Sequence, residues 1–252
     1  MSDNEIMKRE EQALASQTAG PLGFDDDDAD DMIIPRVKIV QLLSPERKTG
    51  EAKEGDIINS LTKEKLNGKK FIPVFKFNNN ILWADRSAGG GILCMARDGK
   101  VGVPTDGSES KMCAKCRKCE FDNTKQGREA IPTCTKFINF FGFFEGERMP
   151  IILSFGKTNY NEGKKMYSLA KVTMQNIWNH AYELNDKTMA KNGNEWSIIS
   201  INAAGVTSEE DREFAMGLFK QFRGTILNYD LSEGTTDEDT TGPNSSIEGT
   251  EF

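Results

Sequence analysis

The segment that most constrains this chain is 111–144, KMCAKCRKCEFDNTKQGREAIPTCTKFINFFGFF, which holds four of the five cysteines. Cys113, Cys116 and Cys119 form two overlapping Cys-x-x-Cys steps, and Cys134 follows a polar loop. Thiolates at this spacing can converge on one tetrahedral zinc ion, with Zn–S bonds of about 2.3 Å. An odd number of clustered cysteines favours reduced thiols over disulfides. The sequence therefore predicts a structural zinc site that fixes the loop ahead of an aromatic strand.

Five thiols compete for the four positions of such a site, because Cys94 precedes the cluster and can replace Cys113. The expected ligands are four of the following: Cys94, Cys113, Cys116, Cys119 and Cys134. Catalytic zinc usually has His or carboxylate ligands. The single histidine, His180, lies far from the cluster and outside any zinc-enzyme motif. No nucleophile–base pair or carboxylate cluster stands out in the sequence, so we do not expect an enzyme.

Charge is distributed unevenly along the chain, whose net charge is −7. Residues 1–31 carry ten acidic and two basic side chains, and residues 230–252 carry seven acidic and no basic ones. Residues 32–229 hold 30 Lys or Arg against 22 Asp or Glu. A basic body between acidic arms fits a polyanionic partner. The arms have little to bury and are expected to be disordered, which leaves 32–229 as the folded domain, with the zinc insertion at about 94–134.

Hydrophobic periodicity predicts a mostly β fold with a few helices, of the α+β class. Alternation or short apolar runs predict strands at 36–42, 56–61, 71–77, 81–84, 92–96, 137–144, 150–155, 181–184 and 196–201. A turn is expected at 78–80. Helical spacing predicts helices over 158–175 and from Ser208 onward, where Ser208 and Asp211 have the spacing of an N-terminal cap.

Basic and aromatic residues coincide between Lys111 and Lys171, where twelve bases and six acids surround Phe137–Phe144, Tyr160 and Tyr167. Single-strand binders follow phosphates with Lys and Arg and stack bases on aromatic rings, at about 1–3 kcal/mol per stack. Phenylalanines occupy both faces of strand 137–144, so either they are core or some rings are left for a ligand. The candidate nucleic-acid contacts are Arg36, Lys38, Lys76, Lys136, Phe137, Phe141, Phe143, Lys157, Tyr160, Lys164 and Lys165.

Several stretches resemble zinc-containing single-stranded DNA-binding proteins of tailed bacteriophages. These are PRVKIVQLLSPE, GDIINSLTKEKL, MPIILSFGKTN and the Cys-x-x-Cys followed by Pro-Thr-Cys134, within residues 33–204. The resemblance implies an oligonucleotide-binding (OB)-like barrel with a zinc-binding insertion, which binds single-stranded DNA with little sequence preference. It also implies an acidic C-terminal tail that modulates DNA binding and recruits replication or recombination proteins in the cytoplasm of an infected bacterial host.

A second hypothesis is a zinc-stapled interaction module or inhibitor that docks on a host polymerase or nuclease. In that case the acidic arms imitate DNA and carry the function, and the basic body does not have to contact DNA. For both hypotheses we expect a soluble protein without a membrane partner. The reason is that no apolar run reaches the roughly 18–20 residues of a membrane span, and the N-terminus lacks a signal-peptide pattern.

Overall fold

The computed structural model describes residues 33–84, 90–121, 124, 131–191 and 193–224. The described residues from Ile34 onward belong to one compact unit, whereas the preceding unit, Met1–Ile33, is described only at Ile33. The predicted disordered arms, 1–31 and 230–252, lie outside the described residues. In chain order the elements are β1 (Val37–Ile39), α2 (Pro45–Thr49), β2 (Ile57–Asn59), β3 (Lys70–Trp83), β4 (Ile92–Ala96), β5 (Val101–Pro104), β6 (Lys111–Met112), η2 (Cys113–Lys115), η3 (Arg117–Cys119), β7 (Cys134–Phe144), β8 (Ile151–Gly156), η5 (Lys157–Asn159), α3 (Tyr160–Val172), η6 (Ile177–Asn179), β9 (His180–Lys191), β10 (Asn194–Val206) and α4 (Glu209–Phe222).

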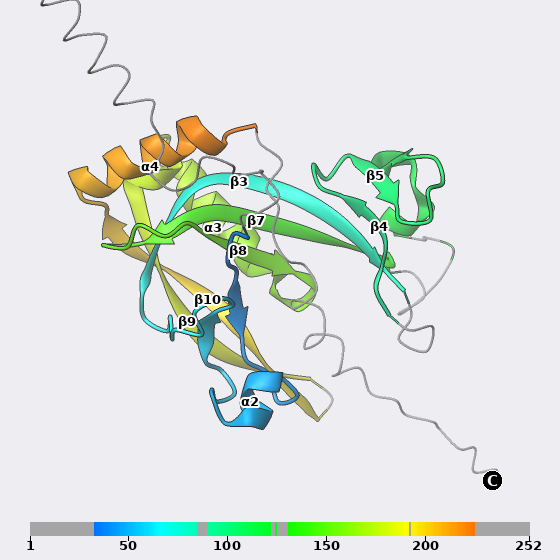
Figure 1. Ribbon diagram of the computed structural model, residues 1–252, viewed down its shortest axis with the longest axis horizontal. Helices are drawn as coiled ribbons and strands as arrows, with labels where there is room; N and C mark the ends of the chain where they lie inside the picture. The colour runs from blue at the N-terminus through cyan, green and yellow to red at the C-terminus, as the bar shows by residue number, and fades with distance from the viewer. Residues whose placement is uncertain (1–32, 85–89, 122–123, 125–130, 192, 225–252) are drawn as a thin grey trace, which may run out of the picture. The chain divides into compact units, whose positions relative to one another are not determined.

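The 14-residue strand β3 organises the larger, eight-stranded sheet. One edge of β3 pairs with β7, which pairs in turn with β8. The other edge is divided, since β9 pairs with the start of β3 and β4 pairs with its end. Strand β10 extends the sheet beyond β9, and β5 and β6 extend it beyond β4. Figure 1 shows the result: the β4–β5 arm lies at the opposite end of β3 from β9 and β10.

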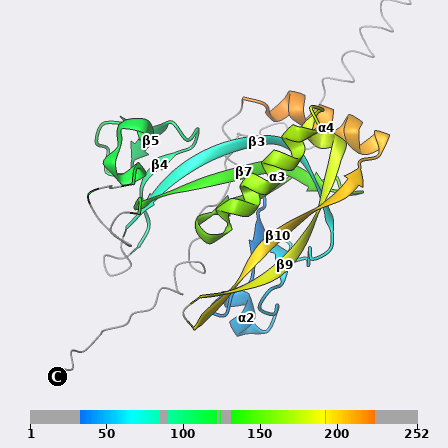
Figure 2. The same ribbon diagram turned by 180° about the vertical axis from the view of Figure 1, so that it is seen from behind.

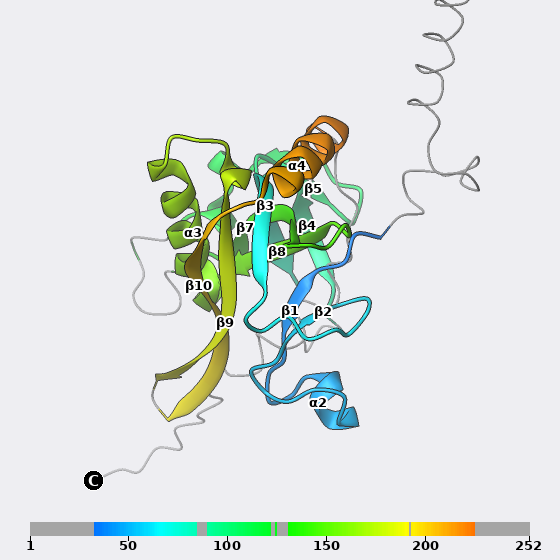
Figure 3. The same ribbon diagram turned by 90° about the vertical axis from the view of Figure 1, so that its left-hand side faces the viewer.

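The β3–β7–β8 part of the sheet is covered on both faces. Phe140 points into one core, which contains Met166 of α3. Phe141 and Phe143 point into a second core, which contains Leu218 of α4. Figures 2 and 3 show α3 and α4 on different sides of these strands. Adjacent residues of β7 are therefore apolar because each face of the strand has its own helix to pack against.

The turn predicted at Asn78–Asn80 is wrong, because β3 continues through these residues. They pair across the ladder with residues 136–138 of β7. The amide of Asn139 donates a hydrogen bond to Oδ1 of Asn79 at 2.7 Å, and each side chain is only 1% exposed. A buried amide is tolerated in a strand when a partner satisfies it. The partner here comes from the neighbouring strand and cannot be read from local sequence.

The structure is mostly β with α-helices, as predicted, but the sheets do not close into a barrel. Strands β1 and β2 form a separate two-stranded sheet. On one side it meets β8 through a single parallel bridge between Arg36 and Ile152. On the other side the Gln41 side chain contacts β10: it donates to the carbonyl of Ser197 at 2.7 Å and accepts from the Ser197 N–H at 3.1 Å. At this seam a side chain takes the place of a strand ladder, and the two sheets stay separate.

Both predicted long helices are present. Ser208 accepts a hydrogen bond from the N–H of Asp211 at 3.1 Å, which confirms the predicted cap of α4. Helix α3 is shorter than the predicted 158–175 and ends at Val172. Met174 then has a φ of 51°, a left-handed conformation that does not continue a right-handed helix. Within the described residues, no helix is long and apolar enough to cross a membrane.

Candidate nucleic-acid interface

Helix α3 carries two tyrosines and two lysines along one flank. Tyr160, Lys164, Tyr167 and Lys171 follow one another at spacings of three or four residues, which places them on the same side of a helix. The ammonium of Lys164 lies 5.0 Å from the ring centroid of Tyr160, and that of Lys171 lies 5.7 Å from the ring centroid of Tyr167. Tyr167 is 39% exposed. Tyr160 is half-buried and packs against the core on one side. We call these four residues the α3 stripe; it combines aromatic rings and positive charge.

Strand β3 adds Lys76 to the α3 stripe. The Lys76 ammonium lies 5.1 Å from the ring centroid of Tyr167 and donates to Oδ1 of Asn78 at 2.9 Å. Burial lowers the pKa of Lys76, and the nearby positive charge of Lys136 lowers it further. Neither lysine forms an ion pair with a carboxylate in the part of the chain that the structure describes. An arriving anion would relieve this repulsion, so the position favours phosphate.

The three candidate phenylalanines are core residues in this structure. Phe141 and Phe143 are fully buried, and Phe137 is 8% exposed. The ring of Phe143 packs edge-on against Phe214 of α4, with 4.9 Å between centroids. The expectation that rings of strand 137–144 are left for bases is therefore corrected: the sequence shows two apolar faces, and the fold covers both.

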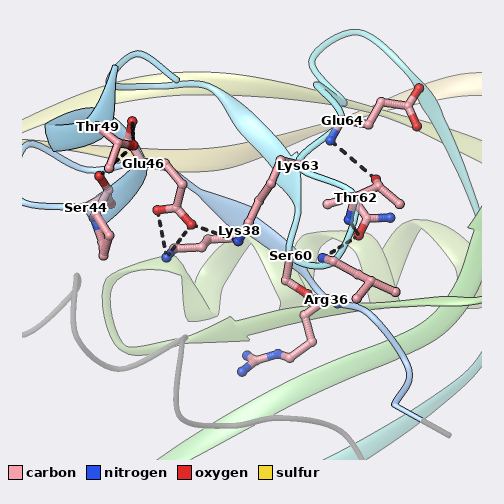
Figure 4. Close-up of polar contacts among 12 residues, drawn as sticks. Arg36, Lys38, Ser44, Glu46, Thr49, Ser60, Thr62, Lys63 and Glu64 are labelled. Carbon is pink, nitrogen blue, oxygen red and sulfur yellow. Dashed lines mark hydrogen bonds and ion pairs between the residues drawn. The ribbon is translucent and has the colours of Figure 1, made fainter. Parts of the chain in front are cut away.

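Lys38 is engaged by a buried carboxylate. Its ammonium lies 3.1 Å from Glu46, and Lys63 approaches the same carboxylate at 3.2 Å. Figure 4 shows Glu46 between the two lysines, with Arg36 and Ser60 nearby. The side chains of Lys38 and Glu46 are only 9% and 6% exposed, so Lys38 is not placed to meet DNA. Arg36 is half-buried, and its backbone N–H donates to the Ser60 hydroxyl at 2.8 Å.

The other candidates divide between two sides of α3. Lys165 donates to the carbonyl of Ile201 and lies beside Glu162, whose carboxylate accepts from the Ile201 N–H at 3.1 Å. This flank of α3 packs against β10, so Lys165 is separated from the α3 stripe. Lys157 directly follows Gly156, the last β8 residue, which pairs with Phe137. Lys157 begins η5 with a φ of 45°, so the chain leaves the β7–β8 ladder at this residue.

Tyr167 and Lys171 are the interface residues that the sequence candidates omit. Both contribute to the local charge and aromatic content, but only the helix places them beside Tyr160 and Lys164. The spacing of residues 160, 164, 167 and 171 was the available signal. Lys76 was a candidate, but its contact with Tyr167 joins elements far apart in sequence.

All five cysteines line one pocket of about 480 Å³ at the end of the sheet that holds β4, β5 and β6. They are free thiols. Burial is the largest cause that raises the pKa of Cys134. Among the described residues, no three Cys, His, Asp or Glu side chains are grouped closely enough to form a ready metal site. The donor set suits zinc in its chemistry, but the thiols must move closer together to share one ion.

Fold and surface together define an α+β protein with a basic, tyrosine-bearing face. A profile of the family described as Pam3 phage gp34-like protein matches residues 4–227. The chain belongs to this family of phage proteins. No curated protein matches the sequence, and no solved structure matches the fold.

Proposed function

We propose that this phage protein binds single-stranded DNA with little sequence preference and acts in phage DNA replication or recombination in the infected host. The observation that carries the proposal is the α3 stripe with Lys76 beside it. Single-strand grooves combine phosphate-tracking cations with rings on which bases stack. Here three lysines surround two tyrosines, with ammonium-to-centroid distances of 5.0–5.7 Å. Base stacking and phosphate contacts carry no direct sequence information, so binding is expected to be sequence-tolerant.

Binding follows from an exchange of partners at the rings. In the free protein, the ammonium groups of the exposed Lys164 and Lys171 lie over the rings of Tyr160 and Tyr167. When DNA arrives, a base takes the ring face and the lysine moves to the adjacent phosphate. The cation–π contact that is lost is worth about 0.5–1 kcal/mol at an exposed site, whereas a base stack contributes about 1–3 kcal/mol. The exchange is therefore favourable, and it releases counterions, which makes affinity fall with salt.

Two further parts of the proposal concern zinc and the acidic tail. Four of the five thiols would hold a structural zinc ion, which would fix the turns η2 and η3 and the start of β7 when bound. The acidic tail, 230–252, would compete with DNA for the basic face and present its end to replication or recombination proteins. The protein would act without catalysing a reaction. Support for an OB-like arrangement comes from β1, which lies against β8, and from Gln41, which reaches β10.

The test is titration of oligo-dT into the protein across salt concentrations, followed by intrinsic fluorescence. Tyr167→Ala is expected to weaken binding roughly 5- to 150-fold, since it removes one stack of about 1–3 kcal/mol. Tyr167→Phe keeps the ring and is expected to bind nearly as wild type. Lys187→Ala removes an exposed charge on β9 and serves as the charge control for Lys76→Ala. Absence of oligo-dT binding by the wild type at low salt refutes the proposal.

The interaction-module hypothesis assigns the function to the acidic arms, and the body offers one apolar surface suited to a protein contact. Val101 and Met112 pair across β5 and β6 and are 40% and 55% exposed, and Val103 on the same face is 57% exposed. Exposed apolar residues on adjacent strands are typical of protein contacts. If this surface carries the function, a pull-down with a host polymerase or nuclease succeeds with the Tyr167→Ala variant and fails with Val103→Asp. The body does not have to bind DNA in that case, so oligo-dT binding would be absent or unaffected by either change.

A further inference from the structure

One face of the β3–β7 ladder connects α3 to the cysteine pocket. Side chains of a strand alternate between faces, so Lys76, Asn78, Asn80 and Leu82 lie on the same face of β3. Asn80 pairs with Lys136, and Leu82 pairs with Cys134, so these β7 residues share that face. Lys76 contacts the α3 stripe at one end, while Asn80, Leu82 and Cys134 line the pocket at the other. Six residues of strand separate the ends, about 20 Å at roughly 3.3 Å per residue.

The pocket end of this face is strongly basic. Lys111, Lys115, Arg117 and Lys118 line the pocket together with the thiols. All four side chains are exposed. Asp106 is the one carboxylate among the described lining residues. None of the four bases forms an ion pair within the described ranges. We call these four residues the basic rim.

The cysteines explain why the basic rim is held at this place. Cys113, Cys116 and Cys119 occur at every third residue, and two 3₁₀ turns place their thiols in the pocket. The turns are closed by hydrogen bonds from the Cys116 N–H to the Cys113 carbonyl at 3.1 Å and from the Cys119 N–H to the Cys116 carbonyl at 2.9 Å. The residues between the thiols are mostly basic. The same turns therefore bury sulfur and direct positive charge to the edge of the pocket.

We infer that single-stranded DNA follows this face from the α3 stripe past Lys76 and Lys136 to the basic rim, which is a second contact region for its phosphates. This path rests on the proposed function and extends the DNA contact from the α3 stripe to the basic rim. The α3 stripe supplies stacking and charge, and the basic rim supplies charge. A short oligonucleotide occupies only the α3 stripe, whereas a longer one reaches both regions. The basic rim thus sets the length of DNA at which affinity stops rising.

The experiment compares binding of oligo-dT from about 4 to about 20 nucleotides, a range that spans known single-strand groove sizes. The rim variant carries Lys115→Gln, Arg117→Gln and Lys118→Gln and leaves every cysteine in place. The control variant carries Lys48→Gln, Lys187→Gln and Lys191→Gln, three exposed bases on α2 and β9. Both variants lose three charges, so non-specific electrostatics change equally.

The rim variant is expected to bind the shortest oligonucleotides as the control does and to gain less affinity with length. For long oligonucleotides its log–log salt slope is expected to fall by about 2, because each phosphate contact contributes roughly 0.7 on single strands. Equal length and salt dependence in the two variants overturns the inference while leaving the proposed function intact. No binding by the wild type at any length overturns both.

A second measurement uses the wild-type protein, so it does not depend on whether the rim variant folds correctly. Lysine acetylation of the wild-type protein is mapped with and without a long oligo-dT. Protection of Lys115 and Lys118 together with Lys164 and Lys171, with Lys187 unchanged, supports the path. Protection of the α3 stripe alone contradicts it.

Discussion

Replacement of Glu46 by Gln tests the buried charge cluster of Figure 4. The carboxylate is 6% exposed and accepts from Lys38 and Lys63 at 3.1–3.2 Å. Removing one partner of a buried ion pair costs about 3–5 kcal/mol, because the remaining charge stays buried. Lys38, whose side chain is 9% exposed, would stay buried without the Glu46 carboxylate, whereas Lys63 is 40% exposed and can turn to water. We therefore expect a loss near the lower limit, about 3 kcal/mol in the free energy of unfolding.

The assay is urea denaturation at several pH values, with Glu54→Gln as the control because Glu54 is exposed on the same segment. Burial acts to raise the pKa of Glu46, but its hydrogen bonds and the two lysines outweigh burial, so the pKa is lowered overall. Stability from a carboxylate with a lowered pKa is fully present above the unfolded-state pKa, about 4.3, and is lost as pH falls through the folded-state pKa. The difference in the free energy of unfolding between wild type and Glu46→Gln should therefore be constant near neutrality and shrink in acid.

Adding Lys38→Met to Glu46→Gln should recover part of the loss, since it removes the buried ammonium. A cost below about 1 kcal/mol at neutral pH would show that the cluster behaves as a surface ion pair and would refute the argument. A difference in unfolding free energy that does not shrink in acid would also refute the argument.

Three further outcomes follow from the structure. Gly142→Ala should cost about 3 kcal/mol or more in urea denaturation, because its Cβ would lie 2.2 Å from a β3 carbonyl oxygen, whereas Gly217→Ala, with nothing within 4 Å, should be neutral or stabilising. The pKa of Lys76 is lowered in the free protein, and a bound phosphate favours its charged form. DNA binding at alkaline pH should therefore take up protons and weaken as pH rises. Calorimetry in buffers of different ionisation enthalpy measures the uptake, and Lys76→Met should abolish it. Elemental analysis should find about one zinc per chain. Replacing both Cys119 and Cys134 by Ser should remove it, because only three thiols remain in the pocket; equal zinc content in both proteins would contradict a four-thiol site.

Local pattern was sufficient for most of the secondary structure. Short apolar runs predicted the strands around residues 71–77, 137–144 and 150–155, and β3, β7 and β8 include all of these residues except Pro150. The cap of α4 was readable because Ser208 and Asp211 are three residues apart and interact within one turn. The clustering of cysteines in one pocket also follows from the sequence, since three of them are neighbours along the chain.

Other features depended on partners that are distant in sequence. Strand β3 runs through three asparagines because β7 supplies ladder partners and Asn139 satisfies Asn79. The candidate phenylalanines became core because α3 and α4 cover opposite faces of β7. Lys38 left the candidate interface because α2 brings Glu46 to it.

The sequence alone therefore determined which residues could supply charge, aromatic rings and thiols, and the periodicities that make them strands and helices. Only the tertiary structure decided which of them reach a ligand. The physical reason is that burial and ion pairing depend on neighbours from other elements. Tyr167 remains 39% exposed beside Lys76 because α3 covers the sheet with its other flank, whereas Phe141 is fully buried by α4.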